Sequence, residues 1–245
     1  MAAVLREASA FGHASQKIRG DVAIAVAAVL SKGDLLQHAT ADVQDNEAVV
    51  HVAMHMLDVI VEPPADDEFG DWMVWRQRDA QGKALKFASE RLRGSRPFML
   101  PLLQQKPSLL EHVSEELRDD LAVVLPAVTK DGAAFPYASE RLRGNAVIAT
   151  AAATSYGDAL HYAADWIRID AAAVLAALSS PRGTCRDILA HVAEKAPALL
   201  RDRNFVLAAA QHAFSVLELA DGHLLGDATF LSEVAQVAGT FIIME

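Results

Sequence analysis

The sequence predicts an all-α protein, an α-solenoid of about nine helical-hairpin repeats of about 25 residues each. The first observation behind this prediction is a duplication, because residues 88–94 and residues 138–144 share the sequence Ala-Ser-Glu-Arg-Leu-Arg-Gly. A looser copy at residues 113–120 lies midway between the two, which sets a period of 25. We therefore expect residues 1–245 to form a single α-solenoid repeat domain, irregular only at residues 59–70 and 179–198.

The second observation is a series of helix-capping residues that keep this register. Asp, Asn and Ser side chains accept hydrogen bonds from the free amides of a helix's first turn, so each member predicts a helix start. Seven positions later most repeats place a small or apolar residue, as Ala127 follows Asp120 and Ala152 follows Asn145. The predicted caps are Asp21, Asn46, Asp71, Ser95, Asp120, Asn145, Asp170, Asp202 and Asp227.

Glycine marks the predicted end of the first helix in the hairpin. Gly33, Gly132, Gly157 and Gly239 each stand twelve residues after a cap, where a residue in the left-handed conformation commonly ends a helix. A second, shorter helix is then expected to lead to the next cap.

Two stretches interrupt the period. Residues 63–68 read Pro-Pro-Ala-Asp-Asp-Glu, a loop composition, at a place where a first helix would otherwise stand. The helix predicted to start at Asp71 then carries Trp72 and Trp75. Residues 170–202 hold seven more residues than a regular repeat, which is about two helical turns.

Net charge, cysteine content and the length of apolar runs limit which partners, sites and locations the sequence is compatible with. The net charge of −10 disfavours a nucleic acid as partner, because such binding depends on neutralising phosphates. Cys185 is the only cysteine, which excludes an internal disulfide and a cysteine-based zinc site. No apolar run has the length of a transmembrane segment, and the N-terminus lacks the layout of a signal peptide. We expect a soluble intracellular protein, in the cytoplasm or inside an organelle.

The regular repeats resemble a known family. They carry Leu-Arg-Asp-Asp at 117–120, Val-Val-Leu at 123–125 and Tyr-Ala-Ser-Glu at 137–140. This 25-residue hairpin is similar to the family catalogued as domain of unknown function 4116, most strongly over residues 83–178. The resemblance implies an all-helical array of tandem units and implies no activity, since none is assigned to that family.

Nine histidines raise the question of a metal site. His51 and His55 have the spacing that places two ligands on one helix face, but no carboxylate lies between them to act as a base. We expect no metal and no cofactor. Most other histidines share one repeat position with Phe and Tyr, which a flat ring packing between repeats explains. The members of this ring column are His13, His38, Phe87, His112, Tyr137, Tyr162 and His191.

A second column, the arginine column, stands two residues before the caps. A ladder of arginines would fit an anionic partner. The alternative, which we expect, is that each arginine pairs with an acid of an adjoining repeat, such as Glu90, Glu115 or Glu140. The members of the arginine column are Arg19, Arg93, Arg118, Arg143 and Arg168.

An enzyme is the least favoured interpretation. Cys185 and His191 would have to serve as nucleophile and base, yet a helical separation of six residues places their side chains on poorly matched faces. Neither an orienting third group nor a glycine-rich phosphate loop accompanies them. We expect no catalytic residue.

The predicted function is that of a non-catalytic scaffold that binds another protein through the extended surface of the array. Trp72 and Trp75 are predicted partner contacts, because Trp is over-represented in binding hot spots; the alternative is that they fill the core of an irregular repeat. Four apolar residues near the C-terminal end are also predicted to be covered by a partner, since burying them is favourable; the alternative is that they fold back over the final hairpin as a cap. These are Phe241, Ile242, Ile243 and Met244. The alternative is an accessory subunit of a large assembly, such as an organellar or photosynthetic one.

Overall fold

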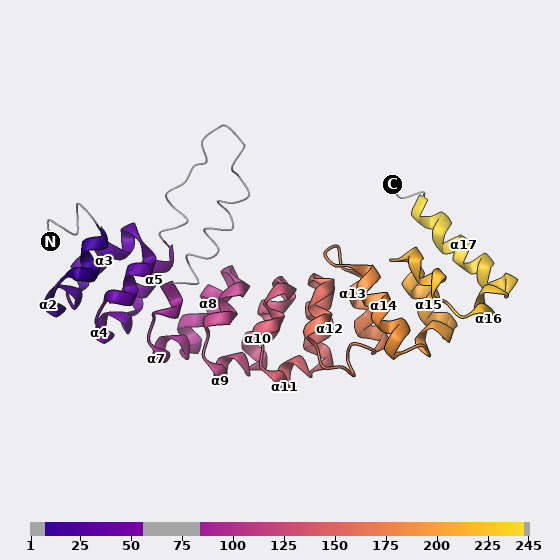
Figure 1. The fold of residues 1–245 in the computed structure, drawn as a ribbon, viewed down its shortest axis with the longest axis horizontal. Coiled ribbons are helices and arrows are strands. Elements are labelled where there is room, and N and C mark those ends of the chain that lie inside the picture. Colours follow the sequence, from indigo (N-terminus) through magenta and orange to yellow (C-terminus); the bar gives the residue numbers. More distant parts are fainter. Residues whose placement is uncertain (1–7, 56–83, 243–245) are drawn as a thin grey trace, which may run out of the picture. The chain divides into compact units, whose positions relative to one another are not determined.

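A computed structural model describes residues 8–55 and 84–242, and every regular element in those residues is a helix (Figure 1). This confirms the all-α prediction for the described part of the chain. The chain divides into two compact units, unit 1 (Met1–Leu117) and unit 2 (Arg118–Glu245). That residues 1–245 form one continuous repeat domain stays a prediction.

In the regular repeats, one long helix is followed by two short helices. Up to the boundary between the units, the elements are η1 (Ala8–His13), α2 (Gln16–Arg19), α3 (Val22–Ser31), η2 (Gly33–His38), α4 (Ala41–Gln44), α5 (Glu47–His55), α7 (Glu90–Arg93), α8 (Arg96–Gln105), η4 (Pro107–His112) and α9 (Glu115–Arg118). After it come α10 (Leu121–Lys130), η5 (Gly132–Tyr137), α11 (Glu140–Arg143), α12 (Ala146–Ser155), η6 (Gly157–Tyr162), α13 (Ala171–Ser179), α14 (Cys185–Lys195), η7 (Leu199–Arg201), α15 (Arg203–Ala210), η8 (Phe214–Glu218), α16 (Gly222–Leu225) and α17 (Ala228–Ile242).

The repeat has three elements rather than the predicted two. In unit 2, the long helix α10 is followed by the 3-10 helix η5 and then by the four-residue helix α11. The break between η5 and α11 falls at Ala138, whose backbone is extended. That extension lets the Ser139 amide donate to the carbonyl of Arg118, 3.0 Å away in the preceding repeat. The predicted second helix is therefore split by a hydrogen bond that joins neighbouring repeats.

The predicted helix caps are largely confirmed. Ser95 holds the N-cap position of α8, but its side chain makes no capping hydrogen bond, and Asp71 lies outside the described residues. The other side chains accept amide hydrogen bonds from the first turn of their helices. They are Asp21, Asn46, Asp120, Asn145, Asp170, Asp202 and Asp227.

The position seven residues after each cap forms the buried face of the long helices, as the spacing predicts. In unit 2, α10 contacts α12 and α12 contacts α13, so these long helices lie side by side (Figure 1). Small residues at the contact allow helix axes to approach closely. The described members of the column are all buried: Ala28, Ala53, Leu102, Ala127, Ala152, Ala177, Ala209 and Val234.

The prediction that glycines end the long helices in the left-handed conformation is wrong. Among the described residues, positive φ occurs only at Gly183. Gly132 and Gly157 instead begin 3-10 helices that touch the next repeat, and a Cβ on Gly157 would lie 2.7 Å from the Ala177 carbonyl oxygen. Glycine is needed at these positions because the backbones of two repeats approach closely there, and not because the backbone conformation favours glycine. Gly239 lies inside α17 and ends no helix.

In the middle of unit 1, the two parts of one repeat are separated in the sequence, and the 25-residue period does not reveal this separation. In regular repeats the linking amide and carbonyl are 21 residues apart, as in the bond from Ser114 to Arg93. The corresponding bond in the middle of unit 1 joins the Ser89 amide to the Gln44 carbonyl at 3.0 Å, across 45 residues. The repeat that begins at Asn46 is therefore completed by residues 84–94. Asp71, where a further repeat is predicted to begin, lies outside the described residues.

Candidate functional site

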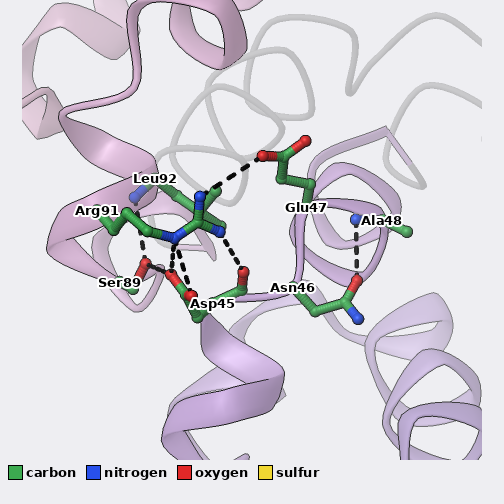
Figure 2. A network of polar contacts seen from close by, with 7 residues as sticks. All are labelled: Asp45, Asn46, Glu47, Ala48, Ser89, Arg91 and Leu92. Atoms are coloured by element: carbon green, nitrogen blue, oxygen red, sulfur yellow. Dashed lines mark hydrogen bonds and ion pairs between the residues drawn. The ribbon is translucent and has the colours of Figure 1, made fainter.

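The most regular polar feature is a clamp that joins consecutive repeats. In unit 1 the Asp45 carboxylate accepts hydrogen bonds from the Ser89 hydroxyl and from Nε of Arg91, at 2.9 Å for the latter (Figure 2). Arg91 also donates to the Asp45 carbonyl at 2.9 Å, and the Ser89 hydroxyl caps the short helix α7 by accepting from the Leu92 amide. The Ser89 and Arg91 hydrogen bonds hold the pKa of Asp45 below its usual value.

The same clamp recurs in unit 2. Asp119 accepts from the Ser139 hydroxyl and from Nε of Arg141 at 3.0 Å, and its pKa is lowered by these two groups in that order. Near the end of unit 2 the charges are reversed, with Arg201 before the cap and Asp221 opposite it at 3.1 Å. The carboxylates of the clamps are fully engaged by neighbouring repeats. We therefore assign the clamps to repeat packing rather than to ligand binding.

The prediction that the arginine column pairs with the acids of adjoining repeats is wrong. Glu90, Glu115 and Glu140 are exposed, and the clamp acids Asp45 and Asp119 pair with Arg91 and Arg141, which are not members of the column. In four members of the column, Nε is buried and has no hydrogen-bond partner among the described residues. They are Arg19, Arg93, Arg118 and Arg143.

The fifth member of the column has different surroundings. Arg168 lies 3.4 Å from Asp165 and 3.3 Å from Nδ1 of His191 on α14. Burial, and after it the charge of Arg168, lowers the pKa of His191. A cavity of about 10 Å³, lined by Leu160, His161 and Ile188 together with these two residues, lies beside them. A space of that size holds about one water molecule, so it has no room for a substrate.

The ring column packs between repeats only in part. A Cβ on Gly12 would lie 3.0 Å from the ring of His38, which places that ring against the preceding repeat. However, His13 is exposed, and Tyr162 is 48% exposed. The column therefore also contributes to the surface.

Trp166 is the largest exposed side chain that the sequence interpretation missed. It lies in the turn at residues 165–169, two residues before Arg168, and 57% of its surface is exposed. Trp166 occupies the repeat position that holds Arg91, Glu116 and Arg141 elsewhere. A tryptophan in a column of charged residues was the signal available in the sequence.

The side chains of the predicted partner contacts are not among the described ones. Trp72, Trp75, Ile243 and Met244 lie outside the described residues. The backbone at residues 241–242 continues α17, so this stretch extends an existing helix rather than opening a further repeat. The side chains of Phe241 and Ile242 are not described. All of these contacts stay predictions.

The residues considered for chemistry have separate partners. The Cys185 thiol donates to the Leu178 carbonyl at 3.9 Å, whereas Nδ1 of His191 faces Arg168. His51 is exposed on α5, and the side chain of His55 is not described. Over residues 8–55 and 84–242, no group of three or more His, Cys, Asp or Glu side chains could hold a metal ion.

Within the described part of the chain, none of the helices combines the length and apolar character that a membrane crossing requires.

Comparison with known proteins shows which family the repeats resemble. No curated protein and no solved structure matches the chain. The family described as "Domain of unknown function (DUF4116)" matches residues 79–118 and again residues 95–143. The match confirms the resemblance seen in the sequence, over residues 79–143.

Proposed function

We propose that the protein is a non-catalytic helical-repeat scaffold that binds another protein. The contacts between repeats within each unit support an α-solenoid, because α3 packs on α5 in unit 1, and α10 packs on α12 and α12 on α13 in unit 2. A solenoid of this length should exceed the radius of gyration of about 18 Å expected for a compact protein of this size. Small-angle X-ray scattering measures that radius directly.

The observation that carries the proposal is the exposure of Trp166. Tryptophan, tyrosine and arginine are the residues most enriched in binding hot spots, and Trp166 stands near Tyr162 and Arg168 in the same repeat. A tryptophan side chain presents a large apolar area that gains stability when a partner covers it. We therefore propose the turn of residues 165–169 in unit 2 as the docking surface.

Co-purification with the tagged full-length chain from its native source tests this assignment. Trp166→Ala should remove the bound protein and leave the thermal melt unchanged, because the side chain contributes little to the core. Val147→Ala is the matched control, since Val147 is 67% exposed on a long helix of the same unit. Identical sets of co-purifying proteins for the wild type and Trp166→Ala would refute the assignment.

A further inference from the structure

We propose that unit 2 binds an extended acidic segment of its partner, in polyproline II conformation, with one carboxylate at every third residue. The carboxylates would be received by three members of the arginine column, Arg118, Arg143 and Arg168. This inference rests on the proposed function and names the chemistry of the partner.

The charge of the column is largely uncompensated. The guanidinium groups of Arg118 and Arg143 form no hydrogen bond or ion pair with the residues that the structure describes, and both side chains are partly exposed. Arg168 is 25% exposed, and its acidic neighbour Asp165 is almost wholly in solvent. Donors that are partly withdrawn from water and lack partners favour an anionic ligand, since charge-assisted hydrogen bonds are the strong ones.

Hydrogen bonds between repeats place Arg118 and Arg143 at equivalent points of consecutive repeats. The Arg118 carbonyl accepts from the Ser139 amide at 3.0 Å, and the Arg143 carbonyl accepts from the Ala164 amide at 3.2 Å. Each of these two arginines therefore stands at the junction with the repeat that follows, and Arg168 follows Arg143 by the same 25 residues that separate Arg143 from Arg118. Packed helices are spaced about 8–10 Å apart, which sets the approximate interval between the arginines.

That interval matches one extended conformation in particular. Polyproline II has three residues per turn and rises about 3.1 Å per residue, so side chains three residues apart share a face at intervals of about 9 Å. A β-strand would instead place such residues on opposite faces. Acidic residues at every third position of a polyproline II segment would thus meet successive arginines.

The exposed rings supply the second element of recognition. Surfaces lined with aromatic side chains bind proline-rich segments in polyproline II conformation. Tyr162 and Trp166 lie in the chain between Arg143 and Arg168, and both are about half exposed. Prolines between the acidic residues of the partner would pack on these rings while the carboxylates reach the arginines.

The test uses the full chain and two fluorescein-labelled peptides in anisotropy titrations at low salt. One peptide contains four Glu-Pro-Pro repeats, and the other has the same composition with the four glutamates adjacent. The periodic peptide should bind about tenfold more tightly, and added salt should weaken that binding. Equal affinity for the two peptides, or no binding of the periodic peptide, would overturn the proposal without the use of any variant.

Variants then locate the site. The double variant Arg118→Gln with Arg143→Gln should weaken binding of the periodic peptide about tenfold, as should Trp166→Ala. Arg186→Gln removes one exposed positive charge of the same unit outside the column and should bind like the wild type. Unchanged affinity in the double variant, with an intact thermal melt, would contradict the site. If the double variant unfolds, Arg143→Lys takes its place, because lysine keeps the charge but loses the planar guanidinium. Arg143→Lys should weaken binding of the periodic peptide, and wild-type affinity in this variant would refute the proposed site.

Further outcomes distinguish a failure of this inference from a failure of the proposed function. A single-stranded oligonucleotide that binds more tightly than the periodic peptide, and is lost in the double variant, would show that the column serves phosphates instead. Loss of the native partner in Trp166→Ala without any binding of the periodic peptide would leave the proposed function standing and remove only this inference. Retention of that partner by Trp166→Ala would refute the proposed docking surface itself.

Discussion

At the residue scale, Asn145 shows how one side chain starts a helix. Its Oδ1 accepts hydrogen bonds from the amides of Val147 at 3.0 Å and Ile148 at 3.3 Å. Asn145→Ala leaves both amides without that acceptor and should lower the free energy of unfolding by about 1 kcal/mol. Ser95→Ala is the matched control, because Ser95 has the N-cap position without a capping bond. Urea melts that show equal losses for the two variants would contradict this account of the caps.

The stabilisation that the Asp227 cap gives to the folded protein depends on pH. Hydrogen bonds from the Thr229 hydroxyl and amide, and then from Arg203, lower its pKa to about 2. Because the folded-state pKa is depressed, the stabilisation is complete above the unfolded pKa of about 4 and is lost as pH falls toward 2. Asp227→Asn should therefore be less stable than the wild type at neutral pH and equal to it near pH 2. Melting temperatures that stay parallel across this range would exclude the linkage.

The sequence predicts caps better than it predicts ion pairs. A cap depends on its own helix, so Asp120 or Asn145 can be recognised locally. The arginine column could not be assigned in the same way, because Arg141 and Arg143 stand two residues apart and compete for the same acids. A useful pattern was nevertheless present in unit 2: Asp119 precedes its cap where the next repeat has Arg141, and Gly144 precedes its cap where the next repeat has Trp166.

At the element scale, glycine controls how closely repeats approach. A Cβ on Gly132 would collide with the Ala152 carbonyl oxygen of the next long helix, which is backbone and cannot turn away. Gly132→Ala should therefore lower the free energy of unfolding by about 1–3 kcal/mol, as overpacking does. Gly144→Ala is the control, because its nearest neighbour would lie 3.4 Å away, an ordinary contact. Denaturant unfolding that ranks Gly144→Ala as the more damaging change would refute this explanation.

The three-element repeat was only partly accessible from the sequence. Apolar spacing identified the long helices, since a face with residues at three, four and seven after the cap is periodic. The separation of η5 from α11 depends on the hydrogen bond that Ser139 makes to Arg118 in another repeat. Contacts of that kind leave no local pattern. The interruption in unit 1 was hidden because it is close to one repeat in length, so the later caps stayed in register.

At the scale of the whole molecule, unit 1 offers a test of which residues build the array. Deleting residues 58–81 would restore a 25-residue spacing between Asn46 and Ser95 and would keep the bonds from Ser89 and Arg91 to the repeat of Asp45. The shortened chain should still unfold in one cooperative transition. Its free energy of unfolding should be equal or higher by about 1–2 kcal/mol, because a shorter connection costs less entropy to close.

A deletion of the same length at residues 84–107 provides the comparison for that prediction. It removes Ser89 and Arg91 together with α8, so it should abolish cooperative unfolding in circular dichroism melts. Equal damage from the two deletions would mean that residues 58–81 are needed for the fold, against the hydrogen-bond register. The deletion of residues 58–81 also removes Trp72 and Trp75. If it retains the native partner while Trp166→Ala loses it, the docking surface belongs to unit 2 and the two earlier tryptophans are not required.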